Sequence, residues 1–242
     1  METTYKDTPL FGGALACDMP ARFADISHLR QVPDSQECYI DKEGFTSIIV
    51  EINERVGGPG SSAEIDGAAL TTHLEEIVPE GDLEGLRVWN TTSTQFSHLD
   101  EDIPAYTLIA TVSSKPPLPP AAAAAAAAHH QGTSTSTSSA IPSSTTTASS
   151  TSSSSTSTSS SSSRANDKLI FTALIITLVR LEREATDILI TINVPHISGE
   201  YDEDEVDLEL GKQGKLIGDA VDYAARIWET FRVRDWGLFK EV

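Results

Sequence analysis

The sequence predicts an α+β sandwich, in which a mainly antiparallel sheet of about six strands has helices laid on it. Three observations lead to this fold class. Several segments alternate apolar and polar residues as strands do, and two others carry apolar residues at helical spacing. In addition, strands that follow one another closely are joined by short turns, which favours antiparallel pairing.

Alternating residues predict the strands of the N-terminal part. Ser47–Asn53 places isoleucine and valine on one face and polar side chains on the other, as a half-buried strand does. Gln36–Asp41 is a shorter candidate that can pair with it as a hairpin through Lys42–Phe45, where Gly44 supplies the turn. Ala14–Asp18 is one more short strand.

A first helix is predicted from Ser61 onward. Ser61 and Glu64 have the spacing of a capping box, in which a serine side chain and a glutamate three residues later satisfy the first backbone N–H groups. Residues that would share one face of a helix then recur every four positions until Pro79 ends the helix. These residues are Ile65, Ala69, His73 and Ile77.

Three longer strands are predicted in the second half of the domain. Tyr106–Val112 and Ile188–Val194 show strand patterns, and Pro195 is expected to end the latter. Leu169–Leu181 is apolar on both faces and rich in β-branched residues, which is typical of a central strand covered on both sides. The turn Glu182–Thr186 joins it to the strand that follows.

The last helix has the clearest pattern of all. One apolar stripe runs along it, and charged residues occupy the opposite side. The stripe consists of Leu216, Ile217, Ala220, Val221, Ala224, Ile227, Trp228 and Phe231.

Residues 116–163 interrupt the strand pattern. They contain an alanine run and a tract in which 27 of 31 residues are Ser or Thr, with no charged residue. Because almost nothing in this segment could form a core that offsets the entropy of ordering it, we expect a disordered insertion. The other 194 residues, 1–115 and 164–242, are enough for a single domain with a real core.

The charge balance excludes several classes of partner. With 36 acidic residues against 17 Lys and Arg, the net charge of -19 repels nucleic-acid backbones and anionic lipid headgroups. We therefore expect no nucleic-acid partner and no membrane insertion, and the longest apolar run is far shorter than the roughly 20 residues of a membrane helix. Because the N-terminus lacks the pattern of a signal peptide, we expect a soluble, intracellular protein.

The sequence does not support an enzyme. No nucleotide-binding loop, hydrolase elbow or zinc-protease motif is present, and we expect no cofactor and no metal. Cys17 and Cys38 stand apart from other ligand residues and are expected to be reduced, buried thiols. The run Glu200–Glu209 holds seven acids and is expected to be a solvated, mobile loop.

The acids within Phe23–Glu37 are of a different kind, because they are spread among apolar and turn residues and should have defined positions. Asp25 suits a cap of the turn that starts at Ser27, and Asp34 suits a cap of the next turn. Glu37 stands at a strand start, where we expect no such structural role, so it is the best candidate for a binding residue.

Six segments, spread over nearly the whole chain outside the insertion, match one known family. They are Leu10–Ala14, Asp25–Glu37, Ser47–Glu51, His73–Glu76, Thr186–Pro195 and Leu238–Phe239. On these segments the chain resembles the Ran guanine-nucleotide release factor (Mog-type) family. The resemblance implies a six-stranded antiparallel sheet between helices, an α/β/α sandwich similar to the PsbP protein of photosystem II.

The resemblance also implies a function. Members of the family bind the small GTPase Ran, promote release of its bound nucleotide and act in nuclear protein import, so Ran and other nuclear transport factors are the expected partners. We expect a monomer in nucleus and cytoplasm. In the family the Ran-binding surface is an acidic cluster, and it is carried over here onto Asp25, Asp34, Gln36 and Glu37, with Glu51, Glu75 and Glu76 as neighbours.

Two other classes of protein stay open. An acidic adaptor would hold Ran or an import factor without altering nucleotide exchange. A small acid hydrolase would use Asp34 and Glu37 as paired carboxylates, and would require a pocket that joins them.

Overall fold

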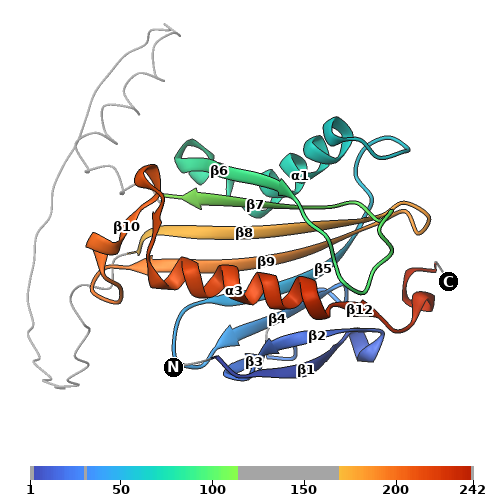
Figure 1. The fold of residues 1–242 in the computed structure, drawn as a ribbon, viewed down its shortest axis with the longest axis horizontal. Coiled ribbons are helices and arrows are strands. Elements are labelled where there is room, and N and C mark those ends of the chain that lie inside the picture. The colour runs from blue at the N-terminus through green and yellow to red at the C-terminus, as the bar shows by residue number, and fades with distance from the viewer. Residues whose placement is uncertain (1–2, 30–31, 114–168, 241–242) are drawn as a thin grey trace, which may run out of the picture. The chain divides into compact units, whose positions relative to one another are not determined.

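The structure is a computed structural model that describes residues 3–29, 32–113 and 169–240 (Figure 1). Its main element is a seven-stranded sheet whose neighbouring strands are all antiparallel. In spatial order the strands are β3 (Phe23–Asp25), β4 (Gln36–Asp41), β5 (Ser47–Glu54), β9 (Thr186–Ile197), β8 (Leu169–Leu181), β7 (Ala105–Val112) and β6 (Leu86–Ser93). The predicted insertion, residues 116–163, lies outside the described residues.

Smaller elements complete the described part of the chain. A three-stranded sheet consists of β1 (Tyr5–Leu10), β2 (Leu15–Pro20) and β12 (Arg232–Val233), and a two-stranded one of β10 (Val206–Asp207) and β11 (Lys212–Gln213). The two long helices are α1 (Ala63–Ile77) and α3 (Gly214–Thr230). Short 3-10 turns are η1 (Phe11–Gly13), η2 (Glu80–Gly85), η3 (Glu203–Glu205), η4 (Leu208–Leu210) and η5 (Trp236–Phe239).

The predicted α+β class with an antiparallel sheet is confirmed, but the main sheet has seven strands instead of six. Two strands of the main sheet escaped prediction: β3 has only three residues, and β6 is an edge strand whose side chains are mostly exposed and so lack apolar alternation. The predicted strand Ala14–Asp18 corresponds to β2, which belongs to the small sheet.

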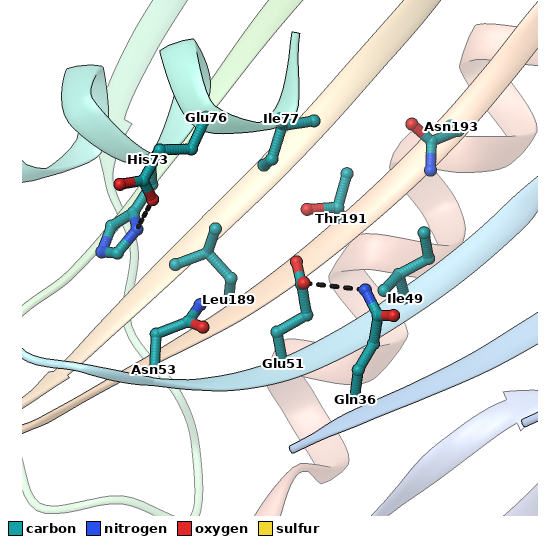
Figure 2. A pocket seen from close by; sticks show the side chains of 10 residues that line it. All are labelled: Gln36, Ile49, Glu51, Asn53, His73, Glu76, Ile77, Leu189, Thr191 and Asn193. Atoms are coloured by element: carbon teal, nitrogen blue, oxygen red, sulfur yellow. Dashed lines mark hydrogen bonds and ion pairs between the residues drawn. The ribbon is translucent and has the colours of Figure 1, made fainter. Parts of the chain in front are cut away.

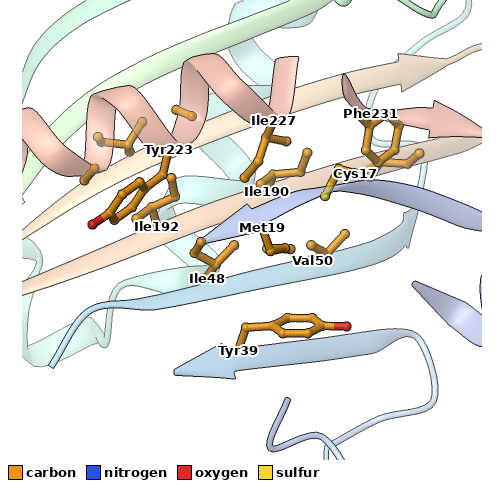
Figure 3. Close-up of a cluster of buried hydrophobic side chains, with 14 of the residues drawn as sticks. Cys17, Met19, Tyr39, Ile48, Val50, Ile190, Ile192, Tyr223, Ile227 and Phe231 are labelled. Carbon is orange, nitrogen blue, oxygen red and sulfur yellow. The ribbon is translucent and has the colours of Figure 1, made fainter. Parts of the chain in front are cut away.

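Two hydrophobic cores lie on opposite faces of the main sheet, because successive side chains of a strand point to opposite sides. Ile188, Ile190 and Ile192 of β9 pack toward α3 and the small sheet. Leu189 packs on the other face, beneath α1. Figure 3 shows side chains of β2, β4, β5, β9 and α3 that meet in the first core. The expected sandwich with helices on both faces is therefore confirmed.

The cap of α1 differs from the prediction. Ser62, and not Ser61, is the N-cap residue, and its side chain accepts a hydrogen bond from the backbone N–H of Ile65 at 3.2 Å. The Ser61 hydroxyl instead donates to the carboxylate of Asp66, which is completely buried. A tertiary contact therefore decides between two adjacent serines that have almost equal capping potential.

The predicted end of the last long strand is also wrong, since β9 continues through Pro195 to Ile197. Pro195 pairs with Thr172 of β8, whereas pairing with β5 already stops at Asn193. Beyond that point β9 has no ladder partner on the β5 side, so a proline, which lacks a backbone N–H, is tolerated.

The acidic run 200–209, expected to be a solvated, mobile loop, is mostly exposed but is not an irregular loop. It folds into η3, β10 and the start of η4. Local hydrogen bonds hold it: Asp202 accepts from the N–H of Asp204 and Asp207 from the N–H of Leu210, both at 3.1 Å. Acidic side chains here serve as caps of tight turns, as short carboxylates often do.

A buried charged cluster ties α1 to the β8–β9 hairpin. The guanidinium of Arg180 donates to Asp187 Oδ1 at 3.1 Å and to Asp66 Oδ1 at 3.0 Å. A further bond reaches the carbonyl of Val56. Asp187 also faces Nε2 of His73 at 3.0 Å, and this nitrogen donates because an ionised carboxylate can only accept. All of these charges lie inside the protein, so each depends on the others for compensation.

Candidate functional site

A polar hollow of about 390 Å³ lies on the α1 face of the main sheet (Figure 2). Side chains of β4, β5, β9 and the C-terminal part of α1 line it. Three of the predicted binding residues converge here, namely Gln36, Glu51 and Glu76. Segments far apart in the sequence thus form one concave surface with two carboxylates.

Strand register brings the first two of these residues together. Gln36 and Glu51 are directly opposite one another in the β4–β5 ladder, so their side chains share a face. The amide Nε2 of Gln36 donates to Glu51 Oε1 at 2.7 Å. Figure 2 shows this bond at the floor of the hollow, with Thr191 and Asn193 of β9 beside it.

Glu51 is the electrostatic centre of the hollow. Partial burial is the largest effect on the pKa of its carboxyl group and raises it, and the nearby charge of Glu76 raises it further. The hydrogen bond from Gln36 and the charge of His73 act in the opposite direction, but the net shift of the pKa is upward. Within the described residues Glu51 has no ion pair with a Lys or Arg. It is therefore a poorly compensated carboxylate, which a cation from another molecule would stabilise.

Two further groups in the hollow can accept hydrogen bonds. The hydroxyl of Thr191 is buried and finds no partner among the residues that the structure describes. Glu76 is 67% exposed at the rim and lies 3.5 Å from Nδ1 of His73. Together with Glu51, these groups can accept several bonds from one ammonium or guanidinium group.

Sequence reasoning missed the contribution of β9 to this hollow. The alternation of that strand already placed Leu189, Thr191 and Asn193 on the face opposite the isoleucines. A threonine and an asparagine on a face that a helix should cover were the signal, because polar side chains on a buried face usually line a cavity or a bond network.

Glu37 lies on the opposite face of the sheet from its neighbour Gln36. Its Oε1 accepts from the backbone N–H of Phe11 at 2.7 Å, and its Oε2 accepts from the hydroxyl of Tyr39 at 3.0 Å. The expectation that Glu37 has no structural role is therefore wrong. It fastens η1, where Phe11 adopts a positive φ of 50°, to the main sheet.

The other predicted residues occupy separate places. Asp25 caps the turn as predicted, since its Oδ1 accepts from the N–H of Ser27 at 2.8 Å. Burial raises the pKa of Asp25, but the bonds from Ser27 outweigh this effect and the net shift is downward. Asp25 pairs with Tyr39 across the β3–β4 ladder, so it shares the face of Glu37.

Asp34 and Glu75 are exposed and belong to neither group. The turn before β4 is closed by a backbone bond from Gln36 to Pro33, and the Asp34 carboxylate bonds to none of the described residues, so the expected side-chain cap is not formed. No bond in the described part joins Asp34 to Glu37, which leaves the paired carboxylates of a hydrolase unsupported.

Substitution of Glu37 by alanine is expected to cost about 1–3 kcal/mol of unfolding free energy, because it leaves the Phe11 N–H without its acceptor. Glu37→Gln retains an oxygen for that N–H and should cost clearly less. Urea unfolding of both variants measures the difference. Equal stability of Glu37→Ala and the parent would show that the Phe11 bond contributes nothing.

Glu51 should make stability depend on pH. Its pKa is raised in the folded state, so between the unfolded value of about 4.3 and the folded value the native chain holds more protons. Its contribution to stability is therefore lost as pH rises through this window. Urea unfolding at several pH values from 4 to 7 should show that the unfolding free energy of Glu51→Gln increases relative to that of the parent as pH rises. A difference in unfolding free energy that is independent of pH would contradict this.

Among the residues that the structure describes, no group of three His, Cys, Asp or Glu side chains could hold a metal ion. Neither long helix in the described ranges combines the length and apolar character needed to cross a membrane. Cys17 and Cys38 are both buried, as expected.

Comparison with known proteins gives consistent matches. A family described as Ran-interacting Mog1 protein matches residues 8–121. A probable Ran guanine nucleotide release factor of Dictyostelium discoideum is 31% identical over 116 residues, which cover 46% of this chain and 56% of the relative. The nuclear import protein mog1 of Schizosaccharomyces pombe is 37% identical over 86 residues, which cover 35% of this chain and 42% of the relative. The chain thus spans about half the length of these curated relatives.

The fold itself is similar to a solved structure. The crystal structure of the Saccharomyces cerevisiae Ran-binding protein Mog1p superposes with a TM-score of 0.58 at 21% identity, and the match covers 99% of this chain and all of that chain. At this identity the likeness concerns the fold. Residues 8–121 therefore resemble the Mog1 family in sequence, and the chain shares the fold of Mog1p.

Proposed function

We propose that this protein binds the small GTPase Ran through its acidic side chains and promotes release of the bound guanine nucleotide, in support of nuclear protein import. The names of its relatives supply the partner. The observation that carries the proposal is the hollow around Glu51, a partly buried carboxylate without a cationic partner among the described residues. Such a site fits a basic side chain of a protein partner.

The physical basis is competition for positive charge. A GTPase holds its nucleotide through Mg²⁺, a lysine and backbone N–H groups, all of which present positive charge to the phosphates. A carboxylate on a rigid strand that binds basic residues near this site competes with the phosphates for them. Glu51 meets this requirement, because its position is fixed by the β4–β5 ladder and the bond from Gln36.

Release then follows from differential binding. If the protein binds the nucleotide-poor state of Ran more tightly, thermodynamic linkage lowers the affinity of Ran for nucleotide by the same factor. Rebinding of nucleotide in turn weakens the complex, so the factor is recycled. No covalent bond is made or broken by this protein, and none of its residues acts as a catalyst.

A fluorescent-nucleotide release assay tests the proposal. Ran loaded with a fluorescent guanine nucleotide is mixed with excess unlabelled nucleotide, with and without this protein, and the loss of fluorescence is followed. We expect a release rate that rises with protein concentration and saturates. Binding to Ran without acceleration at saturating protein would favour the acidic adaptor and reject the release activity.

The proposal also covers the oligomeric state, the location and the domain organisation of the protein. We propose a monomer that resides in nucleus and cytoplasm, where a nuclear import factor meets Ran, and a single domain that residues 116–163 interrupt. The pairing of β7 with β8 supports this domain organisation, because these strands flank the interruption and are direct neighbours in one sheet. Sedimentation of the full chain and of a chain that lacks residues 116–163 would test both points.

A further inference from the structure

A second, smaller pocket lies on the α3 face of the main sheet, where β9 ends. It has a volume of about 180 Å³, smaller than the roughly 300–1,000 Å³ of sites for drug-sized ligands. His196 of β9 and Tyr201 form part of its wall, and Glu200, Asp202 and Glu205 of the acidic run stand around it. The size suits one side chain of a partner.

His196 lines this pocket, and one of its ring nitrogens has no hydrogen-bond partner among the described residues. The ring is fully buried, and its Nδ1 lies 2.9 Å from the carbonyl oxygen of Val194. A carbonyl only accepts, so Nδ1 carries the proton and Nε2 of the neutral ring has a lone pair. Burial lowers the pKa of His196, which favours this neutral form. No described residue bonds to Nε2, so a donor is missing.

Aromatic rings fix the orientation of the imidazole. Phe171 stacks on it with ring centres 4.1 Å apart and an interplanar angle of 15°. Tyr201 stands nearly perpendicular to it at 4.7 Å and 84°. The unpaired nitrogen is therefore held in place by packing, and the Tyr201 ring offers a π surface beside it.

The carboxylates around the pocket differ from the others of the run. Glu203 accepts from Ser198, and Glu209 pairs with Arg87. In contrast, the side chains of Glu200 and Glu205 bond to nothing in the described part of the chain. The one basic group in the lining, Lys215, already pairs with Asp219 on α3. Unsatisfied acceptors thus dominate the pocket.

We propose that this pocket binds the guanidinium group of an arginine on a protein partner. A ligand for it must donate several hydrogen bonds, carry positive charge and lie against an aromatic ring, and guanidinium has all three properties. A metal ion does not fit, since no group of three metal-ligating side chains occurs among the described residues. The pocket lies on the sheet face opposite the Glu51 hollow, so this inference is independent of the proposed function.

The probe is N-acetyl-arginine methylamide, titrated into the full chain labelled with ¹⁵N-histidine. We expect a saturable change in the Nε2 resonance of His196, because its lone pair gains a donor. N-acetyl-citrulline methylamide, which has nearly the same shape without the charge, should bind at least about tenfold more weakly. Equal binding of the two, a stronger response to N-acetyl-lysine methylamide, or no change at Nε2 would overturn the proposal.

Variants locate the site without touching the buried ring. The double substitution Glu200→Gln with Glu205→Gln removes two exposed carboxylates. It should lower the affinity for the arginine probe about tenfold, since each exposed ion pair contributes a factor of about three to the affinity. The matched control is Asp204→Asn, which removes one charge from the same run outside the pocket. An equal loss in the control and the double variant would show general charge attraction and reject the pocket.

Discussion

Substitution of Arg180 by alanine is expected to lower the free energy of unfolding by about 3–5 kcal/mol. The side chain is only 1% exposed and is the cation between Asp66 and Asp187, both fully buried. Removal of the guanidinium leaves two carboxylates inside the protein without compensation. It also takes a donor from the carbonyl of Val56 in the loop between β5 and α1, and it removes the bond from the β8–β9 hairpin to Asp66 of α1.

Chemical unfolding of the Arg180→Ala variant measures this loss. The matched control is Arg183→Ala in the adjacent turn, whose side chain is 86% exposed and should change stability by at most about 0.5 kcal/mol. If Arg180→Ala were as stable as the control, the two carboxylates would have to be protonated or hydrated in the native state, and the buried cluster would not hold α1 in place.

Charge reversal by Glu51→Lys is expected to weaken Ran binding by about 2–5 kcal/mol, roughly 30-fold to several thousand-fold. In the proposed complex Glu51 is covered by the partner, so the substituted ammonium would face a basic side chain in a site that excludes water. Glu51→Gln should also weaken binding, but less, because it removes attraction without adding repulsion. Titration of Ran with each variant measures the affinities.

Glu54→Gln serves as the matched control. Glu54 lies at the end of the same strand, is exposed and points to the other face of the sheet. Its substitution by glutamine removes one charge as Glu51→Gln does, so it should alter Ran affinity only through the weak long-range field. Folding is checked in parallel, since Glu51→Gln is expected to be at least as stable as the parent at pH 7. Equal affinities of the Glu51→Gln and Glu54→Gln variants would remove the hollow from the interface.

Glu37 shows why stability must be measured beside binding. A Glu37→Lys variant that binds Ran poorly could have lost a partner contact or the internal bonds to Phe11 and Tyr39. Glu37→Gln separates these causes, because it keeps an acceptor for Phe11 and removes the charge. Weak binding together with parental stability would favour a direct contact with Ran.

Most of the described fold was predictable from periodicity, because burial imposes a repeat of two on strands and of about 3.6 on helices. The strands β4, β5, β7 and β8 and the helix α3 follow their predicted ranges closely. The prediction failed for the edge strand β6, because its exposed side chains leave no apolar alternation in the sequence. It also failed for the N-cap of α1, where the bond of Ser61 to Asp66 determines which serine caps the helix.

The sequence by itself determined the fold class, the acidic balance and the segments that carry the family resemblance, since these depend on residue types and local spacing. Only the tertiary structure decided which acids share a surface. Gln36 and Glu37 are adjacent in sequence, yet they point to opposite faces because a strand alternates its side chains. Glu51 and Glu76, 25 positions apart, meet in one hollow because β5 and α1 pack on the same side of the sheet.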